Sequence, residues 1–344
     1  MNDVERNRKT HRNILELIGR TPLVLLNKVT EGLQAEIYAK LEFMNPTGSV
    51  KDRTAYHMIA KAVSDGRTSP GQVIIENSSG NMAMGLALVA VQLGFRLKVV
   101  VRDRISKEKV DMLKAMGAEV VKVSSSLPPE SPDSYNNITP RLAAETPESY
   151  FPDQHGNREN NEAHYLTTGP EIWEQMEGRI DYFVAGLGTG GTVCGAGKFL
   201  KEKDPGIKVI GVDPAGSVFY DYFHTGRRVN PSPYLVEGLG DEFIIGCVDF
   251  SVLDDVVRVS DRDAFLTCRE LIRREGILAG GSSGAALWAS LSLAGKVGKP
   301  VRIVTVFLGS AFRYLSTVLN DEWLEEHIPG QRTGPDAGSK TGAA

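Results

Sequence analysis

One lysine stands where a predicted turn becomes a predicted helix, in the stretch NPTGSVKDRTAYHMIAKAV. Pro46, Thr47 and Gly48 predict the turn, and Lys51 lies at or just inside the start of the helix. A helix N-terminus disfavours a cation, so a lysine there has a lowered pKa more readily than a lysine on a solvated face. Such an amine suits covalent amine chemistry. The alternative is a surface lysine beside Asp52.

A run of small residues, GLGTGGTVCGAGKFL, follows one predicted strand and opens a predicted helix. Its centre, from Gly188 to Thr192, offers bare backbone amides and two hydroxyl groups at a helix N-terminus, which suits a phosphate group. The same run satisfies the pattern G-x-G-x-x-G, and Asp213 stands at the end of the next strand, so a dinucleotide site is the rival interpretation. The third interpretation is a tight turn that binds no ligand.

Two further stretches place small polar residues before apolar helices. SSGN ends at Asn81, directly before an apolar helix, and GGSSGA places Ser282 after two glycines. Each side chain could face a ligand beyond the carboxyl end of a strand. Alternatively, Asn81 is the N-cap of its helix, and Ser282 or Ser283 is the N-cap of the other.

Short strands alternate with helices around all of these stretches, which predicts an α/β fold with parallel sheets covered by helices on both faces. The serine- and proline-rich segment Ser124–Pro140 interrupts the alternation and is predicted to be a linker or a lid. Serines are expected to cap two of the helices. The elements that carry this prediction are strands 73–76 and 97–101, a third strand after Gly117, a helix from 81 that ends at Gly94, and helices capped by Ser106 and Ser260.

Composition limits the possible functions. The chain has 344 residues, 41% hydrophobic and 24% charged, with a net charge of −4, which predicts an ordinary globular protein and makes nucleic acid an unlikely partner. No apolar run approaches the ~20 residues of a membrane helix, and no signal-peptide core is present, so we expect a cytoplasmic protein. No metal site is expected, because the spacing of the cysteines fits none. Buried structural thiols are expected at Cys194, Cys247 and Cys268.

Taken in order, Lys51, the SSGN loop, the GTGGT loop and GGSSGA resemble the pyridoxal-phosphate enzymes of fold type II, the tryptophan synthase β family. The resemblance runs from Leu15 to Leu324 and points to the cysteine synthase and cystathionine β-synthase branch. It is strongest toward bacterial cystathionine β-synthase-like proteins in stretches such as HYLTTGPEIW and YLVEGLG.

The resemblance implies two three-layer αβα domains with mostly parallel sheets and the cofactor, pyridoxal 5′-phosphate, in the cleft between them. We expect residues 1–47 and 156–330 to form the larger domain, 48–155 a smaller mobile domain that carries the substrate loop, and 331–344 a disordered tail. A homodimer is also implied.

Roles follow position by position from the resemblance. Lys51 would hold the cofactor as an internal aldimine and shuttle the α-proton, Asn81 would bind the cofactor's 3′-oxygen, and Ser282 would meet the pyridine nitrogen. The phosphate would be bound by Gly188, Thr189, Gly190, Gly191 and Thr192. The substrate carboxylate would be held by Ser78, Ser79, Gly80, Met82 and Gln154.

The sequence departs from the family pattern at three places. The substrate loop, usually T-S-G-N-T-G, has Met82 in place of its second threonine, which removes a hydroxyl group and adds apolar surface. Gly309 stands where relatives usually have an aspartate. Asp241 and Glu242 lie in the region that contacts the incoming nucleophile, where two carboxylates would favour a cationic or amino-bearing partner.

The resemblance implies a β-replacement reaction through an aminoacrylate, on L-serine or on O-acetyl- or O-phosphoserine. A thiol nucleophile would give a cysteine- or cystathionine-like product. Two alternatives stay open at this point. The nucleophile could be an amine or a specialised natural-product substrate, as in diaminopropionate-forming relatives, or the chain could be a catalytically altered scaffold that only binds the cofactor.

Overall fold

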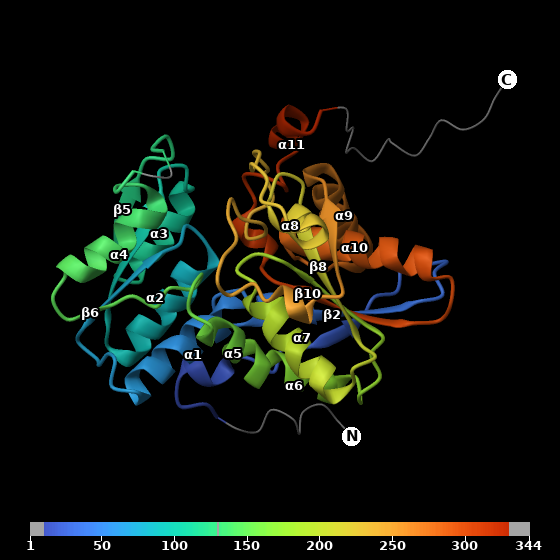
Figure 1. Ribbon diagram of the computed structural model, residues 1–344, viewed down its shortest axis with the longest axis horizontal. Helices are drawn as coiled ribbons and strands as arrows, with labels where there is room; N and C mark the ends of the chain where they lie inside the picture. Colours follow the sequence, from blue (N-terminus) through green and yellow to red (C-terminus); the bar gives the residue numbers. More distant parts are fainter. Residues whose placement is uncertain (1–9, 129–130, 330–344) are drawn as a thin grey trace.

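The computed structural model describes residues 10–128 and 131–329, which form two α/β bodies lying side by side (Figure 1). The predicted tail at 331–344 lies outside the described residues. Within the described ranges, no helix combines the length and the apolar character that crossing a bilayer requires.

The smaller body is built on a four-stranded sheet with the order β5-β4-β3-β6, in which every strand pair is parallel. Its strands are β3 (Val73–Asn77), β4 (Arg96–Arg102), β5 (Glu119–Val123) and β6 (Ser149–Tyr150). Its helices are α2 (Asn81–Leu93), α3 (Lys107–Ala115) and α4 (Tyr135–Glu145). Helix α1 (Lys51–Ser64) packs against α2 and also against α5 of the larger body.

The larger body is built on a six-stranded sheet with the order β1-β2-β10-β7-β8-β9, in which only the β1–β2 pair is antiparallel. Its strands are β1 (Leu23–Leu25), β2 (Glu36–Leu41), β7 (Tyr182–Gly186), β8 (Lys208–Pro214), β9 (Asp255–Val259) and β10 (Arg302–Phe307). Its helices are α5 (Glu159–Leu166), α6 (Thr168–Gln175), α7 (Gly191–Lys203), α8 (Phe219–Thr225), α9 (Asp261–Glu275), α10 (Gly281–Val297) and α11 (Asp321–His327).

These two sheets confirm the predicted fold class, a two-domain α/β protein with mostly parallel strands. The strands of the smaller sheet all lie between residues 73 and 150, whereas the larger sheet takes strands from both sides of that interval. We propose the boundaries predicted above, after residues 47 and 155, as the division between the two domains.

Local sequence signals set the ends of several helices. Helix α2 ends at Gly94, which adopts the left-handed conformation with a φ of 76° that glycine tolerates without strain. The Ser106 hydroxyl accepts a hydrogen bond from the Lys109 amide, and Ser260 does the same for Asp263. These three predicted helix ends are confirmed.

The predicted loop Ser124–Pro140 is wrong in its second half, because α4 begins at Tyr135 and contains Pro140. Proline removes one backbone donor from a helix interior. Helix α4 packs on β3 and β4, and Thr139 on its inner face is fully buried. Tertiary packing therefore outweighs the local preference of the proline.

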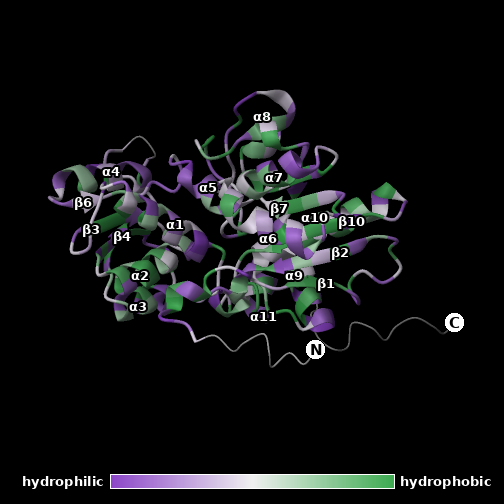
Figure 2. Cartoon of the chain, turned by 90° about the horizontal axis from the view of Figure 1, so that it is seen from below, coloured by the Kyte–Doolittle hydropathy of each residue, from purple (hydrophilic) through white to green (hydrophobic). Residues whose placement is uncertain are grey.

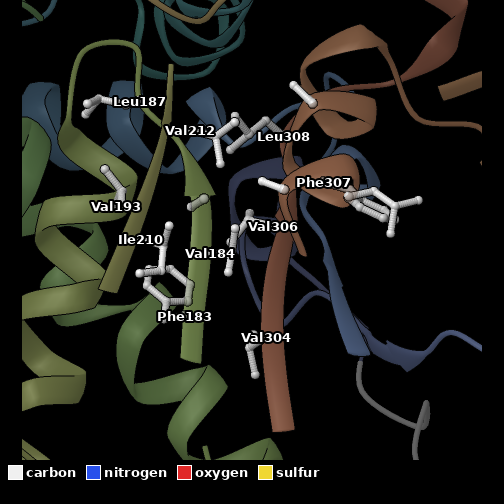
Figure 3. Packing of buried hydrophobic residues seen from close by; sticks show 14 of the residues in the cluster. Phe183, Val184, Leu187, Val193, Ile210, Val212, Val304, Val306, Phe307 and Leu308 are labelled. Carbon is white, nitrogen blue, oxygen red and sulfur yellow. The ribbon is translucent and has the colours of Figure 1, made fainter. Parts of the chain in front are cut away.

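Hydrophobic side chains fill the space beside the larger sheet. Figure 3 shows buried side chains on both β7 and β10, among them Phe183, Val184, Val304 and Val306, and all four are inaccessible to solvent. Helix α2 is hydrophobic along most of its length (Figure 2), and it is buried in the core of the smaller body. Burial of this kind supplies the main favourable free energy of folding and gives rigid platforms for the loops between elements.

Four connecting loops leave the carboxyl ends of strands and meet between the two bodies. Strands β2, β10 and β7 are parallel neighbours, so the loops that follow them emerge at one edge of the larger sheet. The loop after β3 comes from the smaller sheet and opens α2. In open parallel sheets, this edge is where ligands bind.

Candidate active site

Lys51 is the first residue of α1 and projects toward the glycine-rich loop after β7. Its Nζ atom donates a hydrogen bond to Thr189 Oγ1 at 3.1 Å, although the two residues lie 138 positions apart. Burial lowers the pKa of Lys51 to about 8, and electrostatic interactions with Cys247 and Glu76, which act in the opposite direction, offset only part of this effect. A substantial fraction of the amine is therefore neutral near pH 8.

The alternative that Lys51 is a surface residue beside Asp52 is wrong. Asp52 is fully buried and accepts hydrogen bonds from the backbone amide and the hydroxyl of Thr47. The Asp52 carboxylate thus closes the turn before the helix, whereas the Lys51 amine binds Thr189. Burial raises the pKa of Asp52 to about 6.

A buried ionic network fixes the helix that carries Lys51. Arg53 Nε lies 2.8 Å from Glu42 Oε2, and Arg53 Nη1 lies 2.6 Å from Glu171 Oε1. Lys40 Nζ completes the network at 2.7 Å from Glu171. These contacts tie α1 to β2 and α6, so the first turn of the helix has a defined position on the larger sheet.

The glycine-rich loop approaches neighbouring backbone too closely for larger residues. A Cβ atom at Gly188 would lie 2.5 Å from the carbonyl oxygen of Gly238, and one at Gly191 would lie 2.0 Å from Asn160 Oδ1. Gly190 is the N-cap of α7 with a φ of 84° and makes no side-chain cap. The first amides of α7 are therefore available to an anion, as the sequence predicts for a phosphate group.

Neutral polar groups surround this loop. Thr189 Oγ1 accepts hydrogen bonds from Lys51 and, at 2.9 Å, from Asn160 Nδ2. Thr192 Oγ1 lies 3.3 Å from His164 Nε2, and burial holds the pKa of His164 well below its usual range. Because His164 is neutral, backbone amides, hydroxyl groups and the helix dipole supply the attraction for an anion here.

The SSGN loop crosses from β3 to α2. Gly80 is the N-cap of α2 and Asn81 is its first residue, so the alternative in which Asn81 caps the helix is wrong. The Ser78 hydroxyl accepts hydrogen bonds from the amides of Gly80 and Ala83, both at 3.3 Å. The Ser79 hydroxyl accepts from the Arg102 amide at 2.8 Å. Both serines therefore hold the shape of the loop.

Three of the residues predicted to hold a substrate carboxylate are buried, namely Ser78, Met82 and Gln154. Met82 is 1% exposed and packs in the core of the smaller body, so its side chain offers no apolar surface to a ligand. This corrects the expectation that Met82 enlarges the apolar part of a substrate pocket. Gln154 is 5% exposed, and its Nε2 donates to the carbonyl oxygen of Asn77 at 3.2 Å, beside the SSGN loop.

Ser282 lies in the first turn of α10 and is 5% exposed. The N-cap of this helix is Gly280, which makes no side-chain cap, so neither Ser282 nor Ser283 has the alternative role of N-cap. The Ser283 hydroxyl is buried without a hydrogen-bond partner in the described residues. A polar ligand at this helix end would meet hydroxyl groups that no capping bond occupies.

The segment after β10 makes hydrogen bonds both to the turn before Lys51 and to the start of α10. Leu308 O accepts from the Val50 amide at 2.9 Å, and Gly309 O accepts from the Gly280 amide at 2.9 Å. Gly309 thus contributes only its backbone carbonyl group at the position where relatives usually have an aspartate. The segment places the loops of Lys51 and Ser282 beside each other.

The carboxylate pair Asp241 and Glu242 is less negative than the sequence suggests. Arg102 Nη1 lies 3.9 Å from Glu242 Oε1 and offsets its charge. Burial raises the pKa of Asp241 to about 6. The Arg102 guanidinium also lies 4.7 Å from the centre of the Tyr135 ring.

Several residues near Lys51 were not predicted from the sequence. Asn160 lies on α5, Glu76 on β3, Arg313 in a short 3₁₀ helix and Cys247 in a turn, and no local motif connects them. Glu76 did carry a signal, because it is a carboxylate in the apolar strand VIIEN, and burial raises its pKa to about 8. All three cysteines are buried free thiols, as predicted, but Cys247 also lies close enough to Lys51 to affect its pKa.

Comparison with known proteins identifies the family. The family described as "Pyridoxal-phosphate dependent enzyme" matches residues 14–309, most of the chain. The chain belongs to this family. Its cofactor is therefore pyridoxal 5′-phosphate, and the chain is an enzyme of the fold type II class that the sequence resembles.

Curated relatives of this pyridoxal-phosphate enzyme carry two names. It is 42% identical over 315 residues to the cystathionine beta-synthase of Apis mellifera, which covers 91% of this chain and 62% of the relative. It is 41% identical over 309 residues to the cysteine synthase of Staphylococcus aureus, which covers 89% of this chain and 96% of the relative. The chain thus spans less than two thirds of the length of the cystathionine beta-synthases that it matches.

A solved structure has a similar fold. The crystal structure of a hydrogen sulfide-producing enzyme from Fusobacterium nucleatum matches with a TM-score of 0.82 and 34% identity, over 90% of this chain and 99% of that chain. This likeness supports the arrangement of the two bodies described above.

The family assignment overturns the dinucleotide interpretation. Asp213, which that interpretation needs for a ribose, is fully buried in β8, and its Oδ2 accepts from the Tyr220 amide at 2.9 Å. The Asp213 carboxylate therefore has a structural role within the larger body.

The residues present fit pyridoxal phosphate. The glycine-rich loop has room for no side chain at Gly188, Gly190 or Gly191, the first amides of α7 have no side-chain cap, and Lys51 projects toward the same loop. At the start of α10, the Ser283 hydroxyl is a buried polar group without a hydrogen-bond partner in the described residues. When bound, the cofactor supplies an electron sink for amino-acid chemistry.

Proposed function

We propose that this enzyme catalyses β-replacement on L-serine, O-acetylserine or O-phosphoserine with a thiol nucleophile, giving a cysteine- or cystathionine-like product. The contact between Lys51 Nζ and Thr189 Oγ1 carries the proposal, because it brings a partly neutral amine to the loop that suits a phosphate group. The relatives named cystathionine beta-synthase and cysteine synthase support the reaction class.

In this proposal, Lys51 attaches the cofactor and moves the α-proton of the donor amino acid. Burial holds part of the lysine population neutral, which is the state that can accept a proton. Gly188, Thr189, Gly190, Gly191 and Thr192 bind the phosphate, Asn81 binds the 3′-oxygen, and Ser282 meets the ring nitrogen. The donor carboxylate is bound by Ser78, Ser79, Gly80, the backbone amide of Met82, and Gln154.

The substrate loop has the chemistry for a carboxylate. The positive end of α2 faces it, and the loop carries two serine hydroxyls that already accept backbone hydrogen bonds, so each can still donate its own proton. We further propose that the enzyme acts as a homodimer in the cytoplasm.

Two measurements test the donor and the acceptor separately. Purified enzyme loaded with cofactor is mixed with O-acetylserine, O-phosphoserine and L-serine in turn, and the visible absorption of the cofactor is followed. A spectral change with at least one donor is expected, and its absence with all three would overturn the donor assignment.

The acceptor is identified by product mass after competition between homocysteine, sulfide and amino-acid amines. We expect a thioether or cysteine product. Asp241 is the observation that favours an amine acceptor, because it is a second acidic group beside Glu242 that Arg102 does not pair. Exclusive carbon–nitrogen bond formation would replace the thiol proposal with that second candidate.

A further inference from the structure

We infer that Arg313 is a positioning residue that orients the Asn81 amide so that its N–H group faces the 3′-oxygen of the cofactor. The inference rests on the role proposed above for Asn81 and extends it to a residue from the opposite end of the chain. Its basis is a set of hydrogen bonds between the segment after β10 and two loops of the site.

The Arg313 guanidinium bridges two loops. Its Nη1 donates to Asn81 Oδ1, and its Nη2 donates to the backbone carbonyl oxygen of Thr47. Thr47 lies in the turn before Lys51, and Asn81 is the first residue of α2. A single planar group therefore joins the turn before Lys51 to the start of α2.

The backbone that carries Arg313 is itself well held. Ser310 donates from its amide to Gly48 O at 3.0 Å, and Ala311 donates to Leu278 O at 3.0 Å. Arg313 then ends a short 3₁₀ helix, Ala311–Arg313, capped by the Ser310 hydroxyl. The backbone that carries the guanidinium consequently has a defined position relative to both Lys51 and α10.

The bond from Arg313 decides which end of the Asn81 amide is free. Because Oδ1 accepts from the guanidinium, Nδ2 is the donor end of the amide, and its two protons allow one hydrogen bond to the Tyr314 side chain and one to the cofactor. A Cβ atom at Gly309 would lie 3.2 Å from Nδ2, so the missing side chain at Gly309 leaves space beside this donor. With the amide turned over, its oxygen would face the oxygen of the cofactor and repel it.

The charge of Arg313 acts in the same direction. Its hydrogen bonds in the described residues go to neutral oxygens of Asn81 and Thr47, not to a carboxylate. Burial lowers its pKa, with Tyr314 and Asp52 as the nearest compensating groups. A partly buried cation whose hydrogen-bond partners are neutral stabilises a negative charge nearby. Arg313 would therefore favour the ionised form of the cofactor's 3′-oxygen.

The test compares enzyme variants Arg313→Gln, Arg313→Lys, Asn81→Ala and the double variant Arg313→Gln/Asn81→Ala, all loaded with pyridoxal phosphate. Arg262→Gln is the matched control, since it removes the same charge from an exposed position on α9. The readouts are the ratio of the two cofactor absorption bands for the ionised and un-ionised 3′-oxygen as a function of pH, and the dissociation constant of the cofactor. Melting temperatures check that each variant folds.

Arg313→Gln should shift the bands toward the un-ionised 3′-oxygen and weaken cofactor binding about fivefold to tenfold, the effect of losing one hydrogen bond. Arg313→Lys should recover part of the band ratio, and Arg262→Gln should match the wild type. In the Asn81→Ala background, Arg313→Gln should add only the smaller part of the change that the charge of Arg313 contributes directly. Should Arg313→Gln not fold, the lysine variant and the Asn81→Ala variant carry the comparison.

Band ratios that stay at the wild-type value in Arg313→Gln and Arg313→Lys overturn the inference, as does a full additional effect in the double variant. Failure of the proposed function looks different. In that case, borohydride reduction of the wild-type enzyme leaves no cofactor mass on Lys51, and the inference falls with it.

Discussion

Lys51 Nζ and Thr189 Oγ1 lie 3.1 Å apart, and this contact joins the first turn of α1 to the loop that opens α7. The two residues come from different sides of the chain segment that forms the smaller sheet. Their contact brings the predicted attachment site and the predicted phosphate site together.

Replacing Lys51 by alanine should abolish covalent attachment of the cofactor, because no other amine occupies its position on the glycine-rich loop in the described residues. Mass spectrometry after borohydride reduction measures the attachment. Lys61→Ala on the same helix is the control, since Lys61 pairs with Asp65 and lies away from the loop. A cofactor adduct that persists in Lys51→Ala would contradict the assignment.

Attachment of the cofactor to the apo enzyme should become faster as the pH rises and should level off above about 8, the pKa to which burial lowers Lys51. Only the neutral amine attacks the aldehyde of the cofactor, so the neutral fraction limits the rate below this pH. Stopped-flow absorbance over a series of buffers gives the profile. A rate that keeps rising toward pH 10.5, the ordinary value for lysine, would show that burial has no such effect.

Gly191→Ala should weaken cofactor binding at least about tenfold and destabilise the fold by about 1–3 kcal/mol, because its Cβ atom would lie 2.0 Å from Asn160 Oδ1. Equilibrium titration with the cofactor and urea unfolding measure the two effects. The control is Gly295→Ala in α10, where a Cβ atom has nothing within 4 Å and alanine favours the helix. Equal cofactor affinity in both variants would count against a phosphate site at Gly191.

Glu76→Gln should change how stability depends on pH. The Glu76 carboxyl has a pKa of about 8 in the folded chain because it is buried, against 4.5 for an ordinary glutamate. Between these values the unfolded state loses the proton while the folded state keeps it, so the wild type loses stability as the pH rises from 4.5 to about 8. The glutamine variant lacks this loss.

Urea unfolding of the apo forms at several pH values measures the difference. The free energy of unfolding of Glu76→Gln, relative to wild type, should increase across this interval by on the order of a few kcal/mol. A constant offset would be the signature of lost hydrogen bonds to the amides of Asn77 and Gln154 alone.

Met82→Thr restores the residue usual in relatives, yet we expect a loss of stability of about 2–4 kcal/mol, because Met82 is 1% exposed in the core of the smaller body. The KM for the donor should stay close to the wild-type value, since the side chain offers no surface to a ligand. Thermal unfolding and steady-state kinetics measure the two quantities. Met112→Thr on α3 is the control, because Met112 is 39% exposed. A large change in KM without a loss of stability would show that the Met82 side chain selects the substrate.

Local signals in the sequence were sufficient for the alternation of strands and helices, and hence for the fold class. The helix end at Gly94 and the caps at Ser106 and Ser260 depend on residues within one turn, so they could be predicted from short stretches. Pro140 shows where this fails, because packing of α4 on the sheet overrides the preference of one residue. Met82 shows the same limit, because the direction in which its side chain points depends on how α2 packs.

The sequence by itself determined the order of the chemical groups: a lysine at a helix start, an SSGN loop, a glycine-rich loop and a GGSS turn. Only the tertiary structure decided which groups meet, because the contacts of Lys51 with Thr189 and of Arg313 with Asn81 span 138 and 232 positions. The parallel strands bring these loops to one edge, and burial there sets the charge of Lys51 and Glu76. No short stretch of sequence contains that information, because desolvation depends on neighbours that the fold supplies.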